Sequence, residues 1–463
     1  MRRSAAPLAL AAVLFLFAVR FHALLIGGVL TFRDAGYFFG PWRTLFARQV
    51  TSGIPPVWID AASCGRAMAA NPNAGVFWPL TWAVPAIGTS GLVLADFALL
   101  LLAVFAALRM LGLSPVSAAA GATVVLFSGV AQTLPIVFTS LAALVPVPIA
   151  LAAVATVDPT RPAQALRRSA IAGGALGLSY FGGEPVITLV AGVSCAALAL
   201  WRGALEVRDF HRATLRLALF GVTAAASLGI AAAQLAPAAG ELARSARGAG
   251  MRPEHGALYW SVEPARALTL LEPRLTGDPF AQDAEDYWGA GTFDAGNPYF
   301  YDLALGLVPL ALALASAADP RGLGALGIAA LGAVLSCGRY LPGYRLLAPS
   351  LSIFRYPEKW WAITTLALAA AAAVSLDAIA APATRARTLR RLALAAGLLA
   401  AVLLAGAGLG ALSPESLKRF LFALRLGAGS ADAARISRLL VPLLLSGAVS
   451  MLLVAALAAL AAL

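Results

Sequence analysis

The sequence predicts an all-α polytopic membrane protein. Of the 463 residues, 60% are hydrophobic and only 12% are charged, whereas about 25% are charged in a typical soluble domain. The mean hydropathy is +0.84, and apolar runs long enough to cross a hydrocarbon core of about 30 Å recur along the chain. Arginines gather in the short polar segments between these runs, as they do in cytoplasmic loops.

The first apolar run predicts a transmembrane helix over about Leu8–Leu30. Arg2 and Arg3 precede it, which places its start in the cytoplasm. A charged start before an apolar run is also typical of a signal peptide, but no small-residue cleavage site follows promptly. We therefore expect an uncleaved first helix.

Further apolar runs predict the remaining helices. Their connections alternate between arginine-rich segments and segments without positive charge, which fits a regular alternation of cytoplasmic and external loops. The pattern predicts one integral membrane domain over 1–463, with about twelve spans and both termini in the cytoplasm. The net charge of +12 resides largely in these arginines, so membrane lipids rather than nucleic acid are the expected partners. The expected helices are 91–111, 116–132, 136–156, 169–181, 185–201, 216–236, 301–318, 323–337, 361–381, 391–411 and 438–462.

Four polar segments are expected on the outer face. They are a first loop at 31–80, a second large loop at 237–300, a substrate-site loop at 338–360, and the segment 413–437. The last of these is rich in arginine, which is unusual outside the cytoplasm. Its amphipathic spacing favours a helix lying on the outer leaflet, and a topology shifted by one span is the alternative.

The first loop contains the leading catalytic candidate, Asp34, shortly after the first apolar run. The tryptophans and phenylalanines around it favour the headgroup level of a bilayer. A carboxylate at a low-dielectric surface, beside Arg33, suits a general base that takes a proton from a hydroxyl. An exposed loop residue or a helix end-cap is the alternative.

Glu184 is the second acidic candidate. It lies between two apolar runs, after Gly182 and Gly183 and before Pro185. An ionisable residue near membrane depth usually faces a cavity or a partner, and the glycines allow close approach of another backbone. The residue would equally suit the N-terminus of the following helix, where an acid interacts with the helix dipole.

The string LSIFRYPEKWW at 351–361 is the most specific short segment. Arg355 and Lys359 are four residues apart, and in a helix they would point toward one surface. Beside Trp360 and Trp361 they would form a clamp for a lipid phosphate. Snorkelling cations in an aromatic belt are the alternative, and Glu358 is expected to pair with one of the two cations.

Metal and nucleophile motifs are weak. In the second loop, Asp283, Glu285 and Asp286 form an acidic cluster that could bind a divalent cation or remain solvated. The three cysteines are far apart, so neither a disulfide framework nor a zinc site is indicated. We expect no resident metal and no certain cofactor.

Several of these strings resemble YfhO-like bacterial membrane proteins, which are relatives of the GT-C glycosyltransferases. The resemblance rests on the run from Asp34 to Leu80 (with GIPPVW and GRAMAANPNAGVFWPL), on NPYFYDLALGLVPL at 297–310 and on 351–361. It implies a GT-C-like bundle whose first external loop packs over a cavity, and a polyprenyl-phosphate sugar as donor. It also implies an inverting reaction with Asp34 as the base, and a lipid phosphate held by Arg355 and Lys359. The location that the resemblance implies is a bacterial cytoplasmic membrane.

The expected function is therefore transfer of a sugar from a lipid-linked donor to an envelope acceptor at the outer membrane face. Alternatives are a transporter or flippase of a lipid-linked precursor, and a non-catalytic envelope scaffold. A transporter is expected to show two repeated halves and broken helices, and the sequence shows no sign of either. The residues expected to bind substrate are Arg355, Lys359, Glu184, Trp42, Trp58, Arg66, Asn71, Arg244 and Tyr356.

Overall fold

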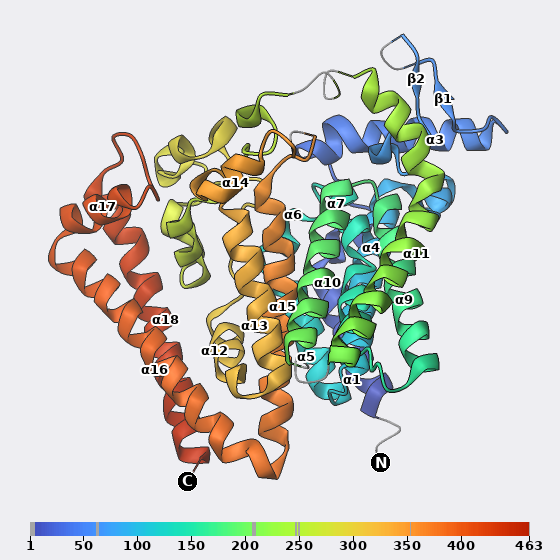
Figure 1. Ribbon diagram of the computed structural model, residues 1–463. Helices are drawn as coiled ribbons and strands as arrows, with labels where there is room; N and C mark the ends of the chain where they lie inside the picture. Colours follow the sequence, from blue (N-terminus) through green and yellow to red (C-terminus); the bar gives the residue numbers. More distant parts are fainter. Residues whose placement is uncertain are drawn as a thin grey trace. The chain divides into compact units, whose positions relative to one another are not determined.

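The computed structural model describes residues 5–61, 64–205, 210–245, 248, 251–351 and 353–462. In this part of the chain the fold is mainly helical, and the only strands are two strands of two residues each that form a hairpin (Figure 1). The chain divides into two compact units. Unit 1 comprises residues up to 126, 133–252 and 352–354, and unit 2 comprises 127–132, 253–351 and 355–463.

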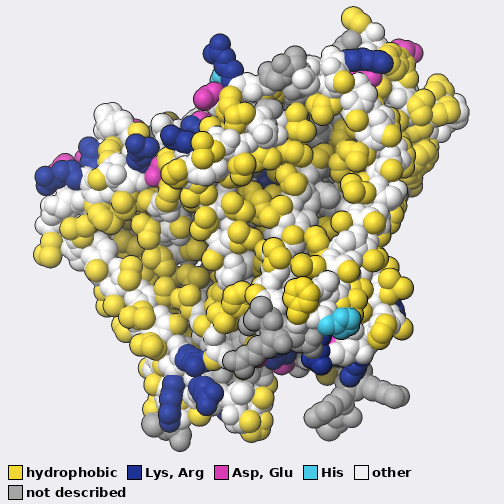
Figure 2. Space-filling model, viewed as in Figure 1, with side chains coloured by type: hydrophobic (Ala, Val, Ile, Leu, Met, Phe, Trp, Pro, Cys, Tyr) yellow, Lys and Arg dark blue, Asp and Glu magenta, His cyan; other side chains and the backbone are white. Residues whose placement is uncertain are grey.

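Seven helical segments within the described residues are long and apolar enough to cross a membrane. On each unit, charged side chains gather near the helix ends, and hydrophobic side chains cover the length between them (Figure 2). These features confirm an all-α membrane protein, while the number of spans and their orientation stay predictions. The seven segments are Pro79–Met110, Phe138–Ala155, Pro185–Ala204, Phe210–Ala243, Pro357–Ala380, Pro382–Leu412 and Ala433–Ala461.

Unit 1 begins with a shorter helix than predicted. α1 ends at Arg20, and a single turn, α2, follows it before the chain turns at Gly27, whose φ of 104° favours glycine. Later helices of the unit pack in pairs, with α9 along α11 (Figure 1). Its helices are α1 (Ala5–Arg20), α2 (His22–Leu25), α3 (Gly40–Thr51), α4 (Val84–Met110), α5 (Pro115–Phe127), α7 (Phe138–Leu144), α8 (Val147–Ala155), α9 (Pro162–Phe181), α10 (Pro185–Leu205) and α11 (Phe210–Ala243).

Two predicted continuous helices are broken in the structure. The run 116–132 forms α5 and then α6 (Gly129–Thr133), and the run 136–156 forms α7 and α8. Pro146 lies at the second break, where its missing N–H and fixed φ interrupt the helical hydrogen bonds. The sequence pattern alone did not indicate these breaks, because apolar character continues across them.

The first loop folds into a small core of its own. α3 packs against the hairpin of β1 (Trp58–Ile59) and β2 (Arg66–Ala67), in which Trp58 lies opposite Ala67 and Ile59 opposite Arg66. Trp42 and Phe46 of α3 are buried with Met68. The 31–80 segment is therefore ordered by apolar packing, although the sequence suggested irregular backbone.

Unit 2 is built around α15, in which 15 of the first 16 residues are buried. α13 packs closely along it because Gly332 leaves room for Thr364, whose hydroxyl donates to Ala329 O at 3.1 Å. α16 and α18 form a long antiparallel pair (Figure 1). The helices of the unit are α6, α12 (Leu307–Ala315), α13 (Pro320–Ser336), α14 (Pro342–Leu347), α15 (Trp360–Ala380), α16 (Pro382–Leu412), α17 (Pro414–Ala423) and α18 (Ala433–Ala461).

The segment 413–437 contains the amphipathic helix that its spacing predicts. Ser413 caps α17 by accepting a hydrogen bond from Ser416 N. The apolar residues Leu417 and Leu421 are buried, and Leu417 lies against Gly410 of α16. The apolar face of α17 is thus covered by protein in unit 2.

Candidate functional site

The predicted RYPEKWW and NPYFYD segments meet in unit 2 around the carboxylate of Glu358. This side chain is 2% exposed. It forms an ion pair with Arg266 at 2.6 Å and accepts hydrogen bonds from the backbone N–H groups of Tyr299 (2.9 Å) and Phe300 (3.1 Å). Arg266 also donates to Phe300 O at 2.5 Å. A buried charge needs this full set of partners, so the network fixes the two segments to each other.

The expected pairing of Glu358 with Arg355 or Lys359 is wrong. Its partner, Arg266, lies 92 positions earlier in the chain. The physical reason is that Arg266 bridges the same segment as Glu358, because it donates both to Glu358 and to Phe300 O while Glu358 accepts from Phe300 N. Arg355 and Lys359 contact the aromatic rings of the same region.

Arg355 and Lys359 share the ring of Tyr356. The Arg355 guanidinium carbon lies 4.6 Å from the centroid of that ring and 5.7 Å from that of Tyr259. The Lys359 ammonium lies 4.7 Å from the Tyr356 centroid and 5.0 Å from that of Tyr299. We call these five residues the cation–tyrosine cluster. Each cation–ring contact is worth about 0.5–2 kcal/mol.

The cluster brings together three residues predicted to bind substrate, but not in the predicted manner. Arg355 and Tyr356 precede the short 3-10 helix Pro357–Lys359, so the helical i, i+4 argument does not apply. Trp360 and Trp361 are buried, and Trp361 donates to Leu303 O at 3.1 Å. The rings beside the cations are therefore tyrosines. Arg355 Nε is buried without a hydrogen-bond partner.

Two strained residues support the cluster. Trp260 has φ 53° and Tyr356 has φ 73°, and their ring centroids are 4.5 Å apart. Such backbone costs about 1–3 kcal/mol per residue and persists where surrounding contacts enforce it. Here Trp260 N donates to Asp294 Oδ2 at 2.7 Å, and its indole N–H donates to Asn297 O at 2.8 Å. Strain of this kind is concentrated at functional sites.

A small hollow partly open to solvent lies beside the cluster in unit 2, with a cavity volume of about 30 Å³, room for about two water molecules. Three ion pairs line it: Arg266 with Glu358, Arg339 with Asp294, and Arg425 with Glu263. Trp260 and Phe293 add aromatic surface, and Ser261, Thr276 and Thr292 add hydroxyls. We call this the paired-charge pocket. Burial, together with Glu263, raises the pKa of Tyr340 in its wall to about 12.

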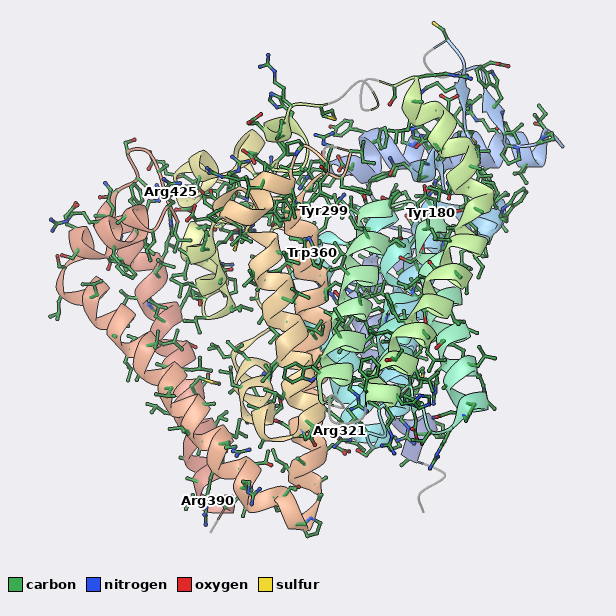
Figure 3. All side chains as sticks on the ribbon, in the orientation of Figure 1. Tyr180, Tyr299, Arg321, Trp360, Arg390 and Arg425 are labelled. Carbon is green, nitrogen blue, oxygen red and sulfur yellow. The ribbon has the colours of Figure 1, made fainter. Side chains whose placement is uncertain are left out.

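Within unit 2 the cluster and the pocket lie at one end of the helices. Tyr299, Trp360 and Arg425 lie near that end, whereas Arg321 and Arg390 lie at the opposite end (Figure 3). Arg321 lies in a connection predicted to be cytoplasmic. Its position at the opposite end of unit 2 from the cluster is consistent with the predicted alternation of cytoplasmic and external loops. α15 begins beside the cluster at Trp360.

The second loop's acidic cluster is paired with an arginine. Arg435, near the start of α18, contacts Asp283, Glu285 and Asp286 at 2.5, 2.8 and 2.6 Å. Hydrogen bonds from Glu285 N and Arg435 lower the pKa of Asp283. No group of three or more histidine, cysteine or acidic residues within the described segments is arranged to hold a metal ion.

Asp34 lies in unit 1, half-buried, between two unusual backbone features. Arg33 before it has φ 49°, and a five-residue π-helix, Ala35–Phe39, follows it. π-helical turns are rare in proteins, and those that do occur are often at functional sites. The Asp34 side chain makes no capping hydrogen bond to this helix, so the end-cap alternative has no support. Arg355 and Lys359 belong to unit 2.

The other predicted substrate contacts in the first loop have separate surroundings. Trp42 is buried in the loop's core. Trp58 is half exposed and donates to Asp60 Oδ1 at 2.7 Å, and Arg66 is exposed on β2. Arg244 is exposed after the end of α11. The structure does not gather these four residues into one site.

The segments that contain Asn71 and Glu184 lie against each other in unit 1. Asn71 accepts a hydrogen bond from Asn73 N at 3.1 Å and caps the turn Pro72–Ala74. Gly183 has φ 99° and passes so close to Pro72 O that an added Cβ would lie 2.7 Å from it. The glycine before Glu184 thus allows the first loop to rest on the start of α10.

Sequence reasoning missed two buried charged residues, one within the first loop and one in α4. Arg43 is 1% exposed and donates to the carbonyls of Asn73, at 3.1 Å, and Ala74. Desolvation lowers its pKa to about 10. Asp96 of α4 is fully buried and accepts from Trp78 Nε1 at 2.9 Å. The burial of Asp96 could have been predicted, because it is an acid within the apolar run 91–111. No feature of the sequence indicates that Arg43 is buried.

Comparison with protein-family models, curated proteins and solved structures finds no match for the chain. The resemblance to YfhO-like proteins and to the GT-C fold therefore stays a prediction.

Proposed function

We propose that this protein is a membrane glycosyltransferase that takes a sugar from a polyprenyl-phosphate donor and transfers it to an envelope acceptor. The observation that carries the proposal is the cation–tyrosine cluster. Two cations share one tyrosine ring there, and the nearest carboxylate in sequence, Glu358, is committed to Arg266. Arg355 also keeps a buried N–H without an acceptor, which an anionic oxygen would satisfy.

The position of the cluster suits a lipid phosphate. It lies at the first turn of the candidate span Pro357–Ala380, and the end of a span lies at the level of the lipid headgroups. Tyrosine rings favour the same level. A phosphate bound there would leave its polyprenyl chain in the hydrocarbon.

The chemistry follows from the charges. The acceptor hydroxyl attacks the anomeric carbon, the bond from that carbon to the phosphate oxygen breaks, and polyprenyl phosphate leaves with the electron pair. Arg355 and Lys359 stabilise the negative charge on the leaving phosphate. Asp34 takes the hydroxyl proton and later releases it to solvent. The strained Arg33 and the π-helix that flank Asp34 support its role as the base.

The test uses purified protein in lipid nanodiscs with a panel of polyprenyl-phosphate sugars, and it measures released polyprenyl phosphate. We expect Asp34→Asn to abolish release with little change in donor binding, and Arg355→Ala to weaken donor binding. Asp60→Asn and Arg345→Ala are matched controls, because both residues are exposed and lie outside the proposed roles. Unchanged release by Asp34→Asn would exclude it as the base. Unchanged donor binding by Arg355→Ala would remove the cluster from the site.

A flippase of a lipid-linked precursor is the second candidate, because the structure has features that transport uses. The breaks between α5 and α6 and between α7 and α8 give discontinuous helices. Asp96 is a buried acid within a candidate span, and its Oδ2 has no hydrogen-bond partner. Translocation of a fluorescent polyprenyl-phosphate lipid in liposomes, unaffected by Asp34→Asn but lost in Asp96→Asn, would favour this function over transfer.

A further inference from the structure

We propose that one exposed face of α16 binds an anionic phospholipid, at the end of unit 2 opposite to the cation–tyrosine cluster. The face begins with three arginines and continues with apolar side chains. We call it the α16 lipid face, and its members are Arg387, Arg390, Arg391, Leu394, Leu398 and Val402. The inference does not depend on the proposed function, because its site and its ligand are separate from those of the sugar donor.

The six side chains lie on one side of the helix. At about 100° per residue, their positions fall within about 120° of one another around the helix axis. All six are exposed, and the apolar members Leu394, Leu398 and Val402 are exposed by 64%, 61% and 53%. The buried side of α16, which includes Leu392 and Leu399, lies on the opposite side of the axis. Within the described part of the chain, the α16 lipid face is therefore not covered by protein.

The three arginines of the face are not neutralised by acids. Within the described residues, none of them forms an ion pair. Asp319 and Asp377 of the same unit engage Arg321 instead, the first at 2.8 Å and the second through electrostatic attraction. Like charges three and four positions apart on a helix repel each other. An anion bound at the face would relieve this repulsion.

The length of the face matches one leaflet of a bilayer. Arg391 and Val402 are separated by about 16 Å along the helix, and half of a hydrocarbon core measures about 15 Å. α16 is itself a candidate span, Pro382–Leu412. A phospholipid with its phosphate at the arginines would therefore lay an acyl chain along the apolar members of the face.

The combination of charge and apolar surface favours a lipid over a soluble anion. Guanidinium groups bind phosphate oxygens with paired hydrogen bonds, and clustered arginines at the end of a span attract anionic headgroups. A soluble phosphate ester would contact only the arginines, whereas a phospholipid contacts the whole face. A zwitterionic headgroup carries a cation that the arginines repel, so the expected ligand has a net negative charge.

This lipid is not the donor of the proposed reaction. Arg390 lies at one end of unit 2, and Tyr299 and Trp360 lie at the other (Figure 3). Basic side chains gather at the end that contains Arg390, and hydrophobic side chains extend from there along the helices (Figure 2). The cation–tyrosine cluster and the α16 lipid face are therefore two separate sites for phosphate groups, at opposite ends of the same unit.

The experiment is native mass spectrometry of the full-length protein in detergent, titrated with phosphatidylglycerol or with phosphatidylcholine of identical acyl chains. One arginine beside anionic lipid contributes about fivefold in affinity. We therefore expect phosphatidylglycerol to bind about tenfold more tightly than phosphatidylcholine, or more. The triple variant Arg387→Gln, Arg390→Gln, Arg391→Gln should reduce this ratio of affinities to about twofold or less.

Two control variants accompany the glutamine variant. Lysine at the same three positions keeps the charge and should keep the ratio within about threefold of that of the wild type. The second control replaces Arg274, Arg321 and Arg345 by glutamine. These arginines are also exposed, but each already contacts a carboxylate or carbonyl oxygen of the chain, so the ratio should not change. Thermal melting without added lipid checks that every variant folds.

The outcomes decide both the place and the ligand. Equal affinities for the two lipids in the wild type, or a ratio unchanged in the glutamine variant, overturn the inference. An equal loss in the second control also overturns it, because the preference would then depend on net charge alone. Glycerophosphoglycerol, the headgroup without acyl chains, should not displace the lipid. If it binds as tightly as phosphatidylglycerol, the arginines bind a soluble phosphate ester and the lipid assignment is wrong. None of these results depends on release of polyprenyl phosphate, so the proposed function is tested separately.

Discussion

Substitution of Glu358 tests whether the buried network around this side chain stabilises unit 2. Glu358→Ala would leave Arg266 as a buried charge without its partner, at about 3–5 kcal/mol. It would also deprive the N–H groups of Tyr299 and Phe300 of their acceptor, at about 1–3 kcal/mol each. These losses overlap, so we expect a decrease of about 4–6 kcal/mol in the free energy of unfolding. A whole protein is stable by about 5–15 kcal/mol.

The assay is denaturant unfolding in detergent micelles, followed by tryptophan fluorescence. Glu358→Gln keeps a neutral acceptor and should lose less than Glu358→Ala. The double variant Arg266→Met with Glu358→Met should be more stable than Glu358→Ala, because it removes both charges of the buried pair. Glu254→Ala, at an exposed acid of the same unit, is the control. A loss below about 1 kcal/mol for Glu358→Ala, or a double variant no more stable than that single variant, would refute the reasoning.

Three further predictions concern other parts of the chain. The pKa of Tyr340 is raised to about 12 from about 10 in the unfolded chain, so its contribution to stability is present below pH 10 and is lost as pH rises toward 12. Melting temperatures measured from pH 9 to 12 should fall less steeply in Tyr340→Phe. Gly129→Ala would place a methyl group 2.4 Å from Cγ of Asp302 and should cost about 1–3 kcal/mol in denaturant unfolding, whereas Gly192→Ala, with open space around it, should not destabilise. Arg435→Ala should lower the melting temperature at low salt, and the difference should shrink in 1 M NaCl because salt screens exposed pairs.

The sequence was a good guide to the class of fold and a poor guide to helix continuity. Hydrophobic runs predict helices because only a helix satisfies its own backbone in lipid, and the long runs near 361–381, 391–411 and 438–462 all contain such helices in the structure. The same signal cannot reveal a break inside an apolar run. The ends of α5 and α7 are set by local backbone geometry and by tertiary packing, and neither changes the hydropathy of the run.

The candidate site was predictable only in part, because its partners are distant in sequence. Arg355, Lys359 and Tyr356 were found from their spacing and from the position of their segment before a span. Arg266 had no local signal, and only the fold reveals that it neutralises Glu358. Asp96 could have been found, because a lone acid in an apolar run requires a partner. Trp42 was misleading, because a tryptophan in a polar loop can serve that loop's own core.

The arginines of the segment 413–437 make contacts that the sequence pattern does not reveal. A cluster of arginine favours the cytoplasmic side of a membrane, and nearby acids change this preference little. In unit 2, however, Arg425 lies near Glu263, and Arg435 contacts three acids of the second loop. A hydrogen bond from Ala428 N to Trp288 O, at 2.9 Å, joins the same two segments. Two arginines of this segment are therefore paired with acids of the second loop, while the topology of the segment stays a prediction.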